Sequence, residues 1–469
     1  MPEFHAEPYI YLPTVTHKSA LIAWGAFYFR VTARGKSKLV DDDDLKYVHP
    51  PRKDSIGACS APYGPARVEV YDTAGALVTT AKTEGSNHCW VAGLAANTEY
   101  TYRVFVKNEQ WAEGERWDWS AADGALIQQG GVYDNRFRTH PDPTAPASSL
   151  AFIALGDFGV GVKRDTPKYR QAAVAAALRA AVDDHGVRVI LTTGDNIYAA
   201  KKFLGIPVGA TGAEDDDWFF TYFQPYRYVI NRVPVYPSIG NHDAAESEEH
   251  DDRAQVEDNF YIRERILGEE AAGRASFGPG LFYRFRFGSD IEFVCIDTSK
   301  EDFFKGARLF DFPKHAEWVD CAFPAAADGV RWRLPFGHHP PFSAGPRHHN
   351  TRSMSRLLPL FGRSGVRAVF SGHEHNFQHS RAAGIDYFVT GAGGKFRDET
   401  PDRFEEAHTV SWSYHCHFLL CQIDGDRMLV RPIAELQPGA DLAGISRWDR
   451  SGTSAETPIE VRLRDDDKQ

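Results

Sequence analysis

The stretch Gly194-Asp195-Asn196-Ile197-Tyr198 follows an apolar run and places a carboxylate and a phenol three residues apart. A carboxylate has two oxygens with several lone pairs, so Asp195 can bridge two metal ions. Tyr198 can reach only one of those ions, which makes the two metals chemically unlike. A phenolate is a hard oxygen donor that suits a strongly Lewis-acidic ion, and iron(III) is the obvious candidate. The stretch alone is weak evidence, because Gly-Asp-Asn is also a common turn sequence.

Four other apolar runs end in a turn of the same design, which carries a glycine and then acidic, amide or imidazole groups. These are Ala151–Leu155 before Gly156-Asp157-Phe158-Gly159, Val233–Ile239 before Gly240-Asn241-His242-Asp243, Arg331–Phe336 before Gly337-His338-His339-Pro340, and Val366–Phe370 before Ser371-Gly372-His373-Glu374-His375. Glycine lets the backbone turn sharply and approach a ligand closely. Ligands gather at the carboxyl ends of strands in sheets built from crossovers, so we expect all five turns to converge.

The five turns together offer seven metal donors in the most favourable positions. They are Asp157, Asp195, Tyr198, Asn241, His338, His373 and His375. With Asp195 as a bridge, each of two ions has four protein ligands and room for water and substrate, as in sites whose ions lie ~3.5–4 Å apart. Any single turn could be an ordinary surface turn. The series of five, each after a strand, favours a metal centre over coincidence.

Between the first two of these strands the sequence predicts a helix. Residues Pro167–Asp184 have apolar side chains at helical spacing, and Gly186 follows them as a stop signal. Strand, helix and strand in this order predict a right-handed crossover with two parallel strands. Near the C-terminus the sequence returns to strands, at Arg427–Pro432 and Pro458–Leu463.

The first part of the chain, from about residue 8 to residue 146, is typical of short strands and turns without helices. The clearest strand candidates are Ser19–Phe27, Ala66–Tyr71 and Tyr100–Val106. This pattern predicts a small all-β sandwich. The stiff, polar stretch His140–Pro146 predicts a boundary, with one domain over residues 1–146 and a second over residues 147–469.

The composition is that of an ordinary globular protein, with 42% hydrophobic and 25% charged residues among 469. No apolar run approaches the ~20 residues of a membrane span, and the N-terminus shows no signal peptide. The net charge of −11, without a stretch dense in Lys or Arg, argues against a nucleic-acid partner. The six cysteines form no Cys-x-x-Cys pair and are expected to be buried thiols. The oligomeric state is left open.

The N-terminal part resembles a fibronectin type III module. The likeness rests on Trp24 in an early strand and on Gly93-Leu94 followed by Asn97-Thr98-Glu99-Tyr100-Thr101-Tyr102. One of these tyrosines would form the corner where the chain crosses between the two sheets. The resemblance implies a β-sandwich over roughly the first 140 residues.

The five turns in series resemble the motifs of the metallophosphoesterase family, over about residues 150–432. The motifs are Gly-Asp-x-Gly, Gly-Asp-x-x-Tyr, Gly-Asn-His-Asp, Gly-His-x-Pro and Gly-His-x-His, and Tyr198 narrows the likeness to the purple acid phosphatase branch. The implied fold class is α/β, a pair of mixed β-sheets packed together with helices on their outer faces. The family is usually exported, so the resemblance alone implies a secreted or periplasmic protein, and the compartment is left open.

The resemblance also implies how the donors divide between the two metals. One ion would be held by Asp157, Asp195, Tyr198 and His375, and the other by Asp195, Asn241, His338 and His373. We expect iron(III) at the Tyr198 site and Fe(II), Zn or Mn at the second site. A phenolate bound to iron(III) absorbs visible light by charge transfer, so the protein is expected to be coloured.

The expected reaction is hydrolysis of a small-molecule phosphate monoester by a hydroxide made from metal-bound water. His242 is placed to donate to the phosphoryl oxygen or the leaving group, with Asp243 orienting its ring. On the loop after Pro340-Pro341 the resemblance places a substrate-facing histidine, and His348 is preferred to its neighbour His349 for this role. The remaining histidines near the motifs are expected to have no role of their own; they are His339, His379, His415 and His417.

Two other functions stay open on this evidence. A metallophosphodiesterase could use the same ligands with a different metal pair, and the colour and the ratio of monoester to diester rates would separate it. A binding or adhesion protein on an inactive phosphatase scaffold would have no physical need for seven intact donors. The acidic stretch Glu246–Asp252 is expected either to form a rim that disfavours polyanionic substrates or to be a solvated loop.

Overall fold

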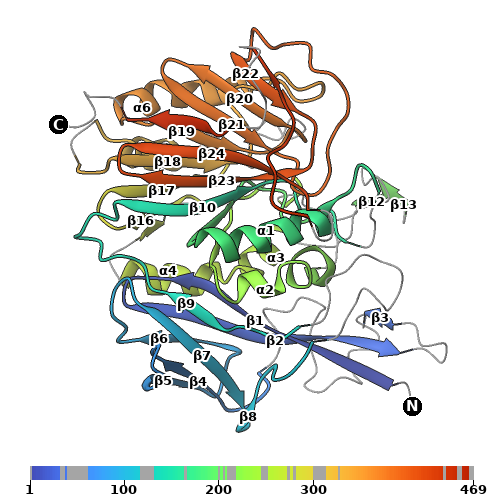
Figure 1. The fold of residues 1–469 in the computed structure, drawn as a ribbon, viewed down its shortest axis with the longest axis vertical. Coiled ribbons are helices and arrows are strands. Elements are labelled where there is room, and N and C mark those ends of the chain that lie inside the picture. Colours follow the sequence, from blue (N-terminus) through green and yellow to red (C-terminus); the bar gives the residue numbers. More distant parts are fainter. Residues whose placement is uncertain are drawn as a thin grey trace.

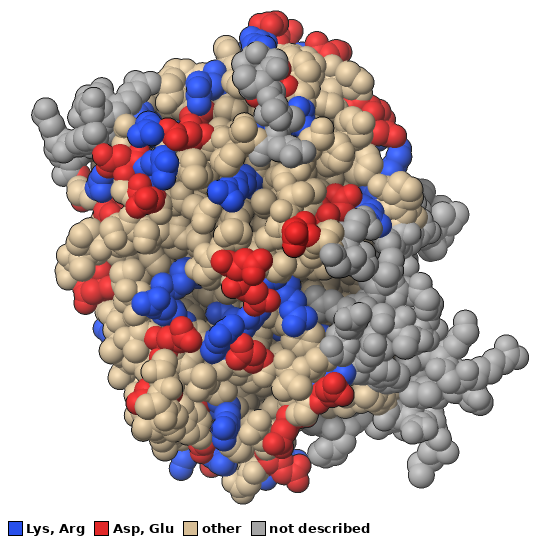
Figure 2. All heavy atoms as spheres, viewed as in Figure 1, with Lys and Arg blue, Asp and Glu red and all other residues tan. Residues whose placement is uncertain are grey.

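The computed structural model describes residues 3–31, 37–39, 62–116, 131–162, 166–198, 201–203, 206–208, 218–243, 252–271, 275–277, 281–298, 313–325, 328–436, 440–450 and 457–463. The acidic residues 246–251, expected at the rim of the site, lie outside these ranges. None of the helices within them combines the length and the apolar character that crossing a membrane requires. On the face drawn in Figure 2, basic and acidic side chains lie interspersed.

Two mixed β-sheets form the larger part of the molecule (Figure 1). The first has the strand order β14 (Val235–Tyr236), β11 (Val189–Thr192), β10 (Ser149–Leu155), β23 (His417–Asp424), β24 (Arg427–Ala434) and β26 (Ile459–Arg462). The second has the order β15 (Ala275–Phe277), β16 (Tyr283–Phe287), β17 (Ile291–Ile296), β18 (Trp332–Gly337), β19 (Ala368–Ser371), β21 (Ile385–Thr390), β20 (Phe377–Ala382), β22 (Thr409–Ser413) and β25 (Trp448–Asp449).

The strands that precede the five turns are parallel within each sheet. In the first sheet β10, β11 and β14 are parallel, and in the second β17, β18, β19 and β21 are parallel. The parallel pairing of β10 with β11 confirms the predicted crossover topology. Because parallel strands end at the same edge of a sheet, the turns that follow them gather there.

The main hydrophobic core lies between the two sheets. The ring of Phe152 on β10 lies 5.2 Å from that of Phe293 on β17 and 5.7 Å from that of Phe370 on β19. Every residue of β11, β17 and β19 is buried, as expected for strands covered on both faces. This packing fixes the strand ends of one sheet against those of the other.

Helices cover the outer faces of the two sheets. Helix α1 (Gln171–His185) lies against β23 and β24, and ends at Gly186, whose φ of 61° is left-handed. The predicted helix is confirmed, but it begins after a β-bridge between Thr166 and Tyr169. On the second sheet, the core around Val294 and Val369 includes Val319 of α5 (Pro313–Ala322) and Phe361 of α6 (Leu358–Arg363).

The remaining elements connect these layers. They are the short strands β12 (Lys201–Phe203) and β13 (Ile206–Val208), the π-helix η2 (Phe219–Phe223), the α-helices α2 (Arg227–Ile230), α3 (Asp252–Asn259) and α4 (Ile262–Ala271), and the 3-10 helix η5 (Arg352–Leu357). In Figure 1 the helices α1 to α4 lie between the first mixed sheet and the N-terminal strands.

The N-terminal part is all-β, as predicted, and consists of two antiparallel sheets. One contains β1 (Glu3–Val15), β2 (Ser19–Val31), β3 (Ser37–Leu39) and β6 (His88–Ala92), and the other contains β5 (Leu77–Thr83), β4 (Ala66–Tyr71), β7 (Glu99–Val106), β8 (Glu109–Gln110) and β9 (Arg136–Arg138). A separate core that includes the buried Trp24 joins them. The hydroxyl of Tyr100 accepts the backbone N–H of Ala95 at 2.9 Å, the kind of bond that a tyrosine corner makes. The fibronectin type III likeness itself stays a prediction.

Strands β1 and β2 bury both of their faces. Ile10 belongs to the core of the N-terminal sheets, whereas its neighbour Tyr9 belongs to the main core, with its ring centroid 4.5 Å from that of Phe223 of the π-helix. A buried ion pair at 3.2 Å joins Arg227 of α2 to Glu7 of β1. The N-terminal sheets thus share packed surface with the rest of the chain, and the division near residue 146 stays a prediction.

Candidate metal centre

The five turns predicted to carry the site come together at the carboxyl ends of their strands, three from the first mixed sheet and two from the second. Asp157 follows β10, Asp195 and Tyr198 follow β11, Asn241 follows β14, His338 follows β18, and His373 and His375 follow β19. Six of the seven side chains form two adjoining groups of donor atoms, which differ in chemistry, and Asp195 lies between the groups.

The first group, the oxygen-rich set, consists of Asp157, Tyr198 and His375. The hydroxyl oxygen of Tyr198 lies 3.1 Å from Asp157 Oδ1 and 3.1 Å from His375 Nε2, and the last two atoms are 3.3 Å apart. All three residues are buried. Three donor atoms at this mutual spacing can contact one ion together.

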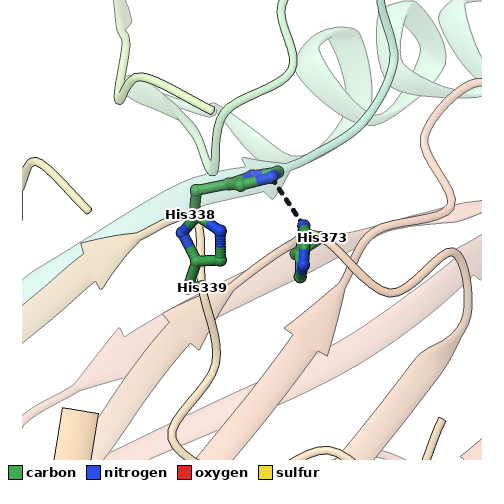
Figure 3. Close-up of side chains that lie close together, drawn as sticks. All are labelled: His338, His339 and His373. Carbon is green, nitrogen blue, oxygen red and sulfur yellow. Dashed lines mark hydrogen bonds between the residues drawn. The ribbon is translucent and has the colours of Figure 1, made fainter. Parts of the chain in front are cut away.

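The second group, the imidazole set, consists of Asn241, His338 and His373. Asn241 Oδ1 lies 2.9 Å from His338 Nε2 and 3.0 Å from His373 Nδ1, and the two nitrogens are 3.1 Å apart. Figure 3 shows the His338 and His373 rings directed at each other. His338 Nδ1 faces the carbonyl oxygen of Thr193 at 2.8 Å, which places the ring hydrogen there and leaves the Nε2 lone pair for the set.

Asp195 lies between the two sets. One of its oxygens, Oδ1, is 3.5 Å from His338 Nε2. Burial, then the charge of Asp157 and then that of Asp195, raises the pKa of the Tyr198 hydroxyl. Its donor atom, with those of Asp157 and His375, falls within a group spanning less than 4.8 Å. Asp195 therefore reaches both sets, as a bridging carboxylate must, and the seven residues fit a pair of metal ions.

The backbone is strained at three of the seven residues. Asp157, Asp195 and His373 have φ angles of 54°, 51° and 72°, in the left-handed region that non-glycine residues seldom adopt. Each such conformation costs on the order of 1–3 kcal/mol and persists where the surrounding structure imposes it, as at binding sites. The strain turns these side chains inward at the strand ends.

Two glycines leave room for the carboxylates. A Cβ at Gly240 would lie 2.1 Å from Asp195 Oδ1, and a Cβ at Gly372 would lie 2.4 Å from Asp157 Oδ2. The glycines of the motifs thus have a steric reason beyond turn formation, since any side chain there would displace a donor.

The electrostatics of the group favour a bound cation. Burial, and next the charge of Asp195, raises the pKa of Asp157 well above that of an ordinary aspartate. Burial lowers the pKa of His373 and His375 well below the usual value, so both rings are neutral and keep a lone pair for a ligand. A metal ion would relieve the repulsion between the two carboxylates.

His242 and Asp243 lie beside the two sets. The His242 ring centroid is 4.5 Å from that of Tyr198, and its backbone N–H donates to Asp195 Oδ1 at 3.0 Å. The buried Asp243 carboxylate accepts hydrogen bonds from the backbone of Asn196, Ile197 and Gly240 and from the Asn196 side chain, so it ties the second turn to the third. Its predicted contact with the His242 ring stays a prediction.

His348 faces the imidazole set, with its ring centroid 3.9 Å from that of His373. The choice of His348 over His349 as the substrate-facing histidine stays a prediction. His339, for which the sequence indicated no role, is buried with its ring 4.4 Å from His373 and its Nδ1 3.0 Å from Thr298 Oγ1 (Figure 3). Its donor atoms lie within 4.8 Å of those of His338 and His373.

Sequence reasoning missed three charged residues at the site. Lys395 Nζ lies 4.2 Å from the ring centroid of Tyr198, Arg397 donates its backbone N–H to the carbonyl of His375, and Glu374 is fully buried between two donors. Only Glu374 stood inside a motif, where a buried carboxylate could have been suspected.

Residues 150–377, which include all seven donors, match the family of calcineurin-like phosphoesterases. This part of the chain is similar to calcineurin-like phosphoesterase domains. Over 53% of its length the chain is 27% identical to tartrate-resistant acid phosphatase type 5 of Rattus norvegicus, of which it covers 74%. It is 24% identical to purple acid phosphatase 4 of Arabidopsis thaliana, again over 53% of its length and covering 70% of that protein.

Solved structures agree on the metallophosphoesterase fold. The structure of PhoD superposes on 99% of the chain with a TM-score of 0.62 at 14% identity, and 94% of that chain is covered. Purple acid phosphatase PPD1 from yellow lupin seeds superposes on 98% of the chain with a TM-score of 0.61 at 13% identity, and 75% of it is covered. The family match and the relatives support phosphoester hydrolysis as the general activity, and the family implies two metal ions.

Proposed function

We propose that the protein is a dinuclear-metal hydrolase of phosphate monoesters, similar to the purple acid phosphatases. The observation that carries the proposal is the pair of donor sets that share Asp195, only one of which contains a phenol. The sequence relatives named above are acid phosphatases, which favours the same reaction for this chain.

In this proposal the oxygen-rich set and Asp195 hold iron(III), and the imidazole set and Asp195 hold Fe(II), Zn or Mn. Carboxylate and phenolate oxygens suit the harder ion, while imidazole and amide donors suit a divalent one. Two such ions supply Lewis-acid charge to a phosphoryl group and lower the pKa of water to give a nucleophile.

The imidazoles beside the sets bind and orient the phosphoryl group. Burial, and next the positive charge of Arg397, lowers the pKa of His348 to about 3, so its ring is neutral at neutral pH. A neutral ring donates one hydrogen bond, which suits a phosphoryl oxygen next to the imidazole set. His242, against the Tyr198 ring, is placed to donate to a phosphoryl oxygen or to the leaving group.

Asp243 acts on the same site through the backbone. By holding the turns of Asp195 and Asn241 together, Asp243 keeps the Asp195 carboxylate in position beside the imidazole set. Export of the protein stays a prediction of the family resemblance.

The test is a phosphoester panel on protein whose metal content has been measured. We expect two metal ions per chain, one of them iron, and faster hydrolysis of p-nitrophenyl phosphate than of its diester, bis-p-nitrophenyl phosphate. The control is Asp157→Asn, which keeps the volume of the oxygen-rich set but removes its carboxylate charge. A higher rate on the diester would favour a metallophosphodiesterase, and a chain that binds no metal would favour the inactive scaffold.

A further inference from the structure

Glu374 lies between the donors His373 and His375 and is itself fully buried, with none of its surface exposed. A buried carboxylate is costly unless its oxygens are bonded, and both oxygens here have partners. Oε2 accepts the backbone N–H of His348 at 2.9 Å, and Oε1 accepts Nη1 of Arg397 at 3.0 Å. One side chain thus joins the loop that carries His348 to the segment that carries Arg397.

The loop of His348 lies directly on the Glu374 side chain. A Cβ at Gly345 would come within 2.3 Å of Glu374 Cγ, so this approach requires glycine. On the other side of the peptide, the Ser343 hydroxyl donates to the His348 carbonyl oxygen at 2.6 Å. The backbone of His348 is therefore held at both its N–H and its C=O, and its ring is left facing His373.

Arg397 is held from two directions as well. Its backbone N–H donates to the carbonyl oxygen of His375 at 2.9 Å, and its guanidinium is paired with Glu374. A second ion pair, between Arg347 and Glu399 at 2.8 Å, joins the same two segments at the exposed surface. Solvent screens the outer pair, so the buried carboxylate is the stronger link.

We infer that Glu374 is a positioning residue for the proposed phosphoester hydrolysis, acting through the backbone of His348. By bonding the backbone N–H of His348, Oε2 fixes the position of the His348 ring next to the imidazole set. Oε1 keeps Arg397 beside the site. The inference rests on the proposed function, because its readout is the binding and turnover of a phosphate monoester.

The test is a double-mutant cycle between Glu374→Ala and His348→Ala, with kcat/KM for p-nitrophenyl phosphate as the readout. Glu374→Ala is expected to lower kcat/KM about 10–100-fold, because the backbone N–H of His348 and Nη1 of Arg397 lose their acceptor and the His348 ring moves. In the His348→Ala background, Glu374→Ala is expected to lower kcat/KM less than about threefold, because Glu374 and His348 act as one unit. An equal loss in both backgrounds would overturn the inference.

Two further measurements separate positioning from a structural role. Glu374→Gln keeps the volume and an acceptor for His348 but loses the acceptor for Arg397, so kcat/KM is expected to lie between that of the Ala variant and that of the unchanged protein. A Gln variant as impaired as the Ala variant would contradict the inference, as would loss of metal from the Ala variant. The matched control is Glu399→Ala, which breaks only the exposed pair and is expected to change kcat/KM less than about twofold.

The same data distinguish failure here from failure of the proposed function. An unchanged protein that holds two metals but hydrolyses no phosphoester overturns the proposed function. An active protein with additive losses in the cycle overturns the role of Glu374 alone.

Discussion

The two donor sets have the same spacing but opposite chemical character. The atoms of the oxygen-rich set lie 3.1–3.3 Å apart and include a carboxylate and a phenol, whereas those of the imidazole set lie 2.9–3.1 Å apart and belong to one amide and two imidazoles. Both sets adjoin Asp195. Selectivity for two different ions would therefore come from ligand type and charge rather than from geometry.

The sets also differ in burial. Asp157, Tyr198 and His375 are all buried. In the imidazole set His338 is buried too, but Asn241 and His373 are only half-buried, and the His348 ring lies against that of His373. The imidazole set is thus the more accessible one. An ion bound by the imidazole set would therefore be more exposed to solvent than one bound by the oxygen-rich set.

The largest effect is expected from Asp195→Asn, because this change weakens both sets at once. The amide keeps the volume but loses the charge that offsets two cations. We expect both ions to bind more weakly. We also expect kcat/KM to fall by more than the ~100-fold that follows from loss of a residue that only supports a metal ligand. Metal analysis and phosphatase assays measure these two changes. Two tightly held ions in the variant would contradict a bridging role for Asp195.

The next largest effects are expected from Tyr198→Phe and Asn241→Ala, each of which changes only one of the two sets. Tyr198→Phe is expected to abolish the visible absorption band while a divalent ion stays in the imidazole set. Asn241→Ala is expected to keep the band and lose the divalent ion, with half of the metal content gone. Visible spectra and metal analysis on the two variants test this, and a band that survives Tyr198→Phe would break the distinction between the sets.

Two glycine substitutions also test whether the two sets bind their ions separately. Gly240→Ala pushes against Asp195 and is expected to weaken both ions, whereas Gly372→Ala pushes against Asp157 and is expected to weaken the iron first. The control is Gly362→Ala on α6, where a Cβ meets no atom within 4 Å. Equal metal loss in both test variants would argue against separate sets.

The smallest effect is expected from Lys395→Met. The ammonium group 4.2 Å from the Tyr198 ring centroid stabilises the electrons of that ring. Its removal is expected to move the charge-transfer band to longer wavelength while the metal content stays the same. An unchanged band position would show that Lys395 does not act on the phenol.

The turns of the site could be predicted from sequence because their signal is local. Each is an apolar strand followed by glycine and a donor, and such strand ends meet wherever sheets are parallel. What Glu374, Lys395 and Arg397 contact could not be predicted, because their partners lie in other segments. Lys395, for example, meets Tyr198 across almost 200 residues of chain.

The length of one strand and the presence of another were missed, for reasons that lie in proline and in burial. The predicted strand Val233–Ile239 is only Val235–Tyr236 in the structure, because Pro234 and Pro237 flank it and have no N–H to pair. Strand β1 contains prolines and is buried on both faces, so it lacks the alternation by which β4 and β7 could be recognised.

In the proposed function, iron lies in the oxygen-rich set and a different ion lies in the imidazole set. Anomalous diffraction from crystals of the purified protein, recorded on both sides of the iron absorption edge, tests this most directly. The account predicts an iron peak among Asp157, Tyr198 and His375, and a second peak among Asn241, His338 and His373. Iron in the imidazole set alone, or no ion in contact with Tyr198, would contradict it.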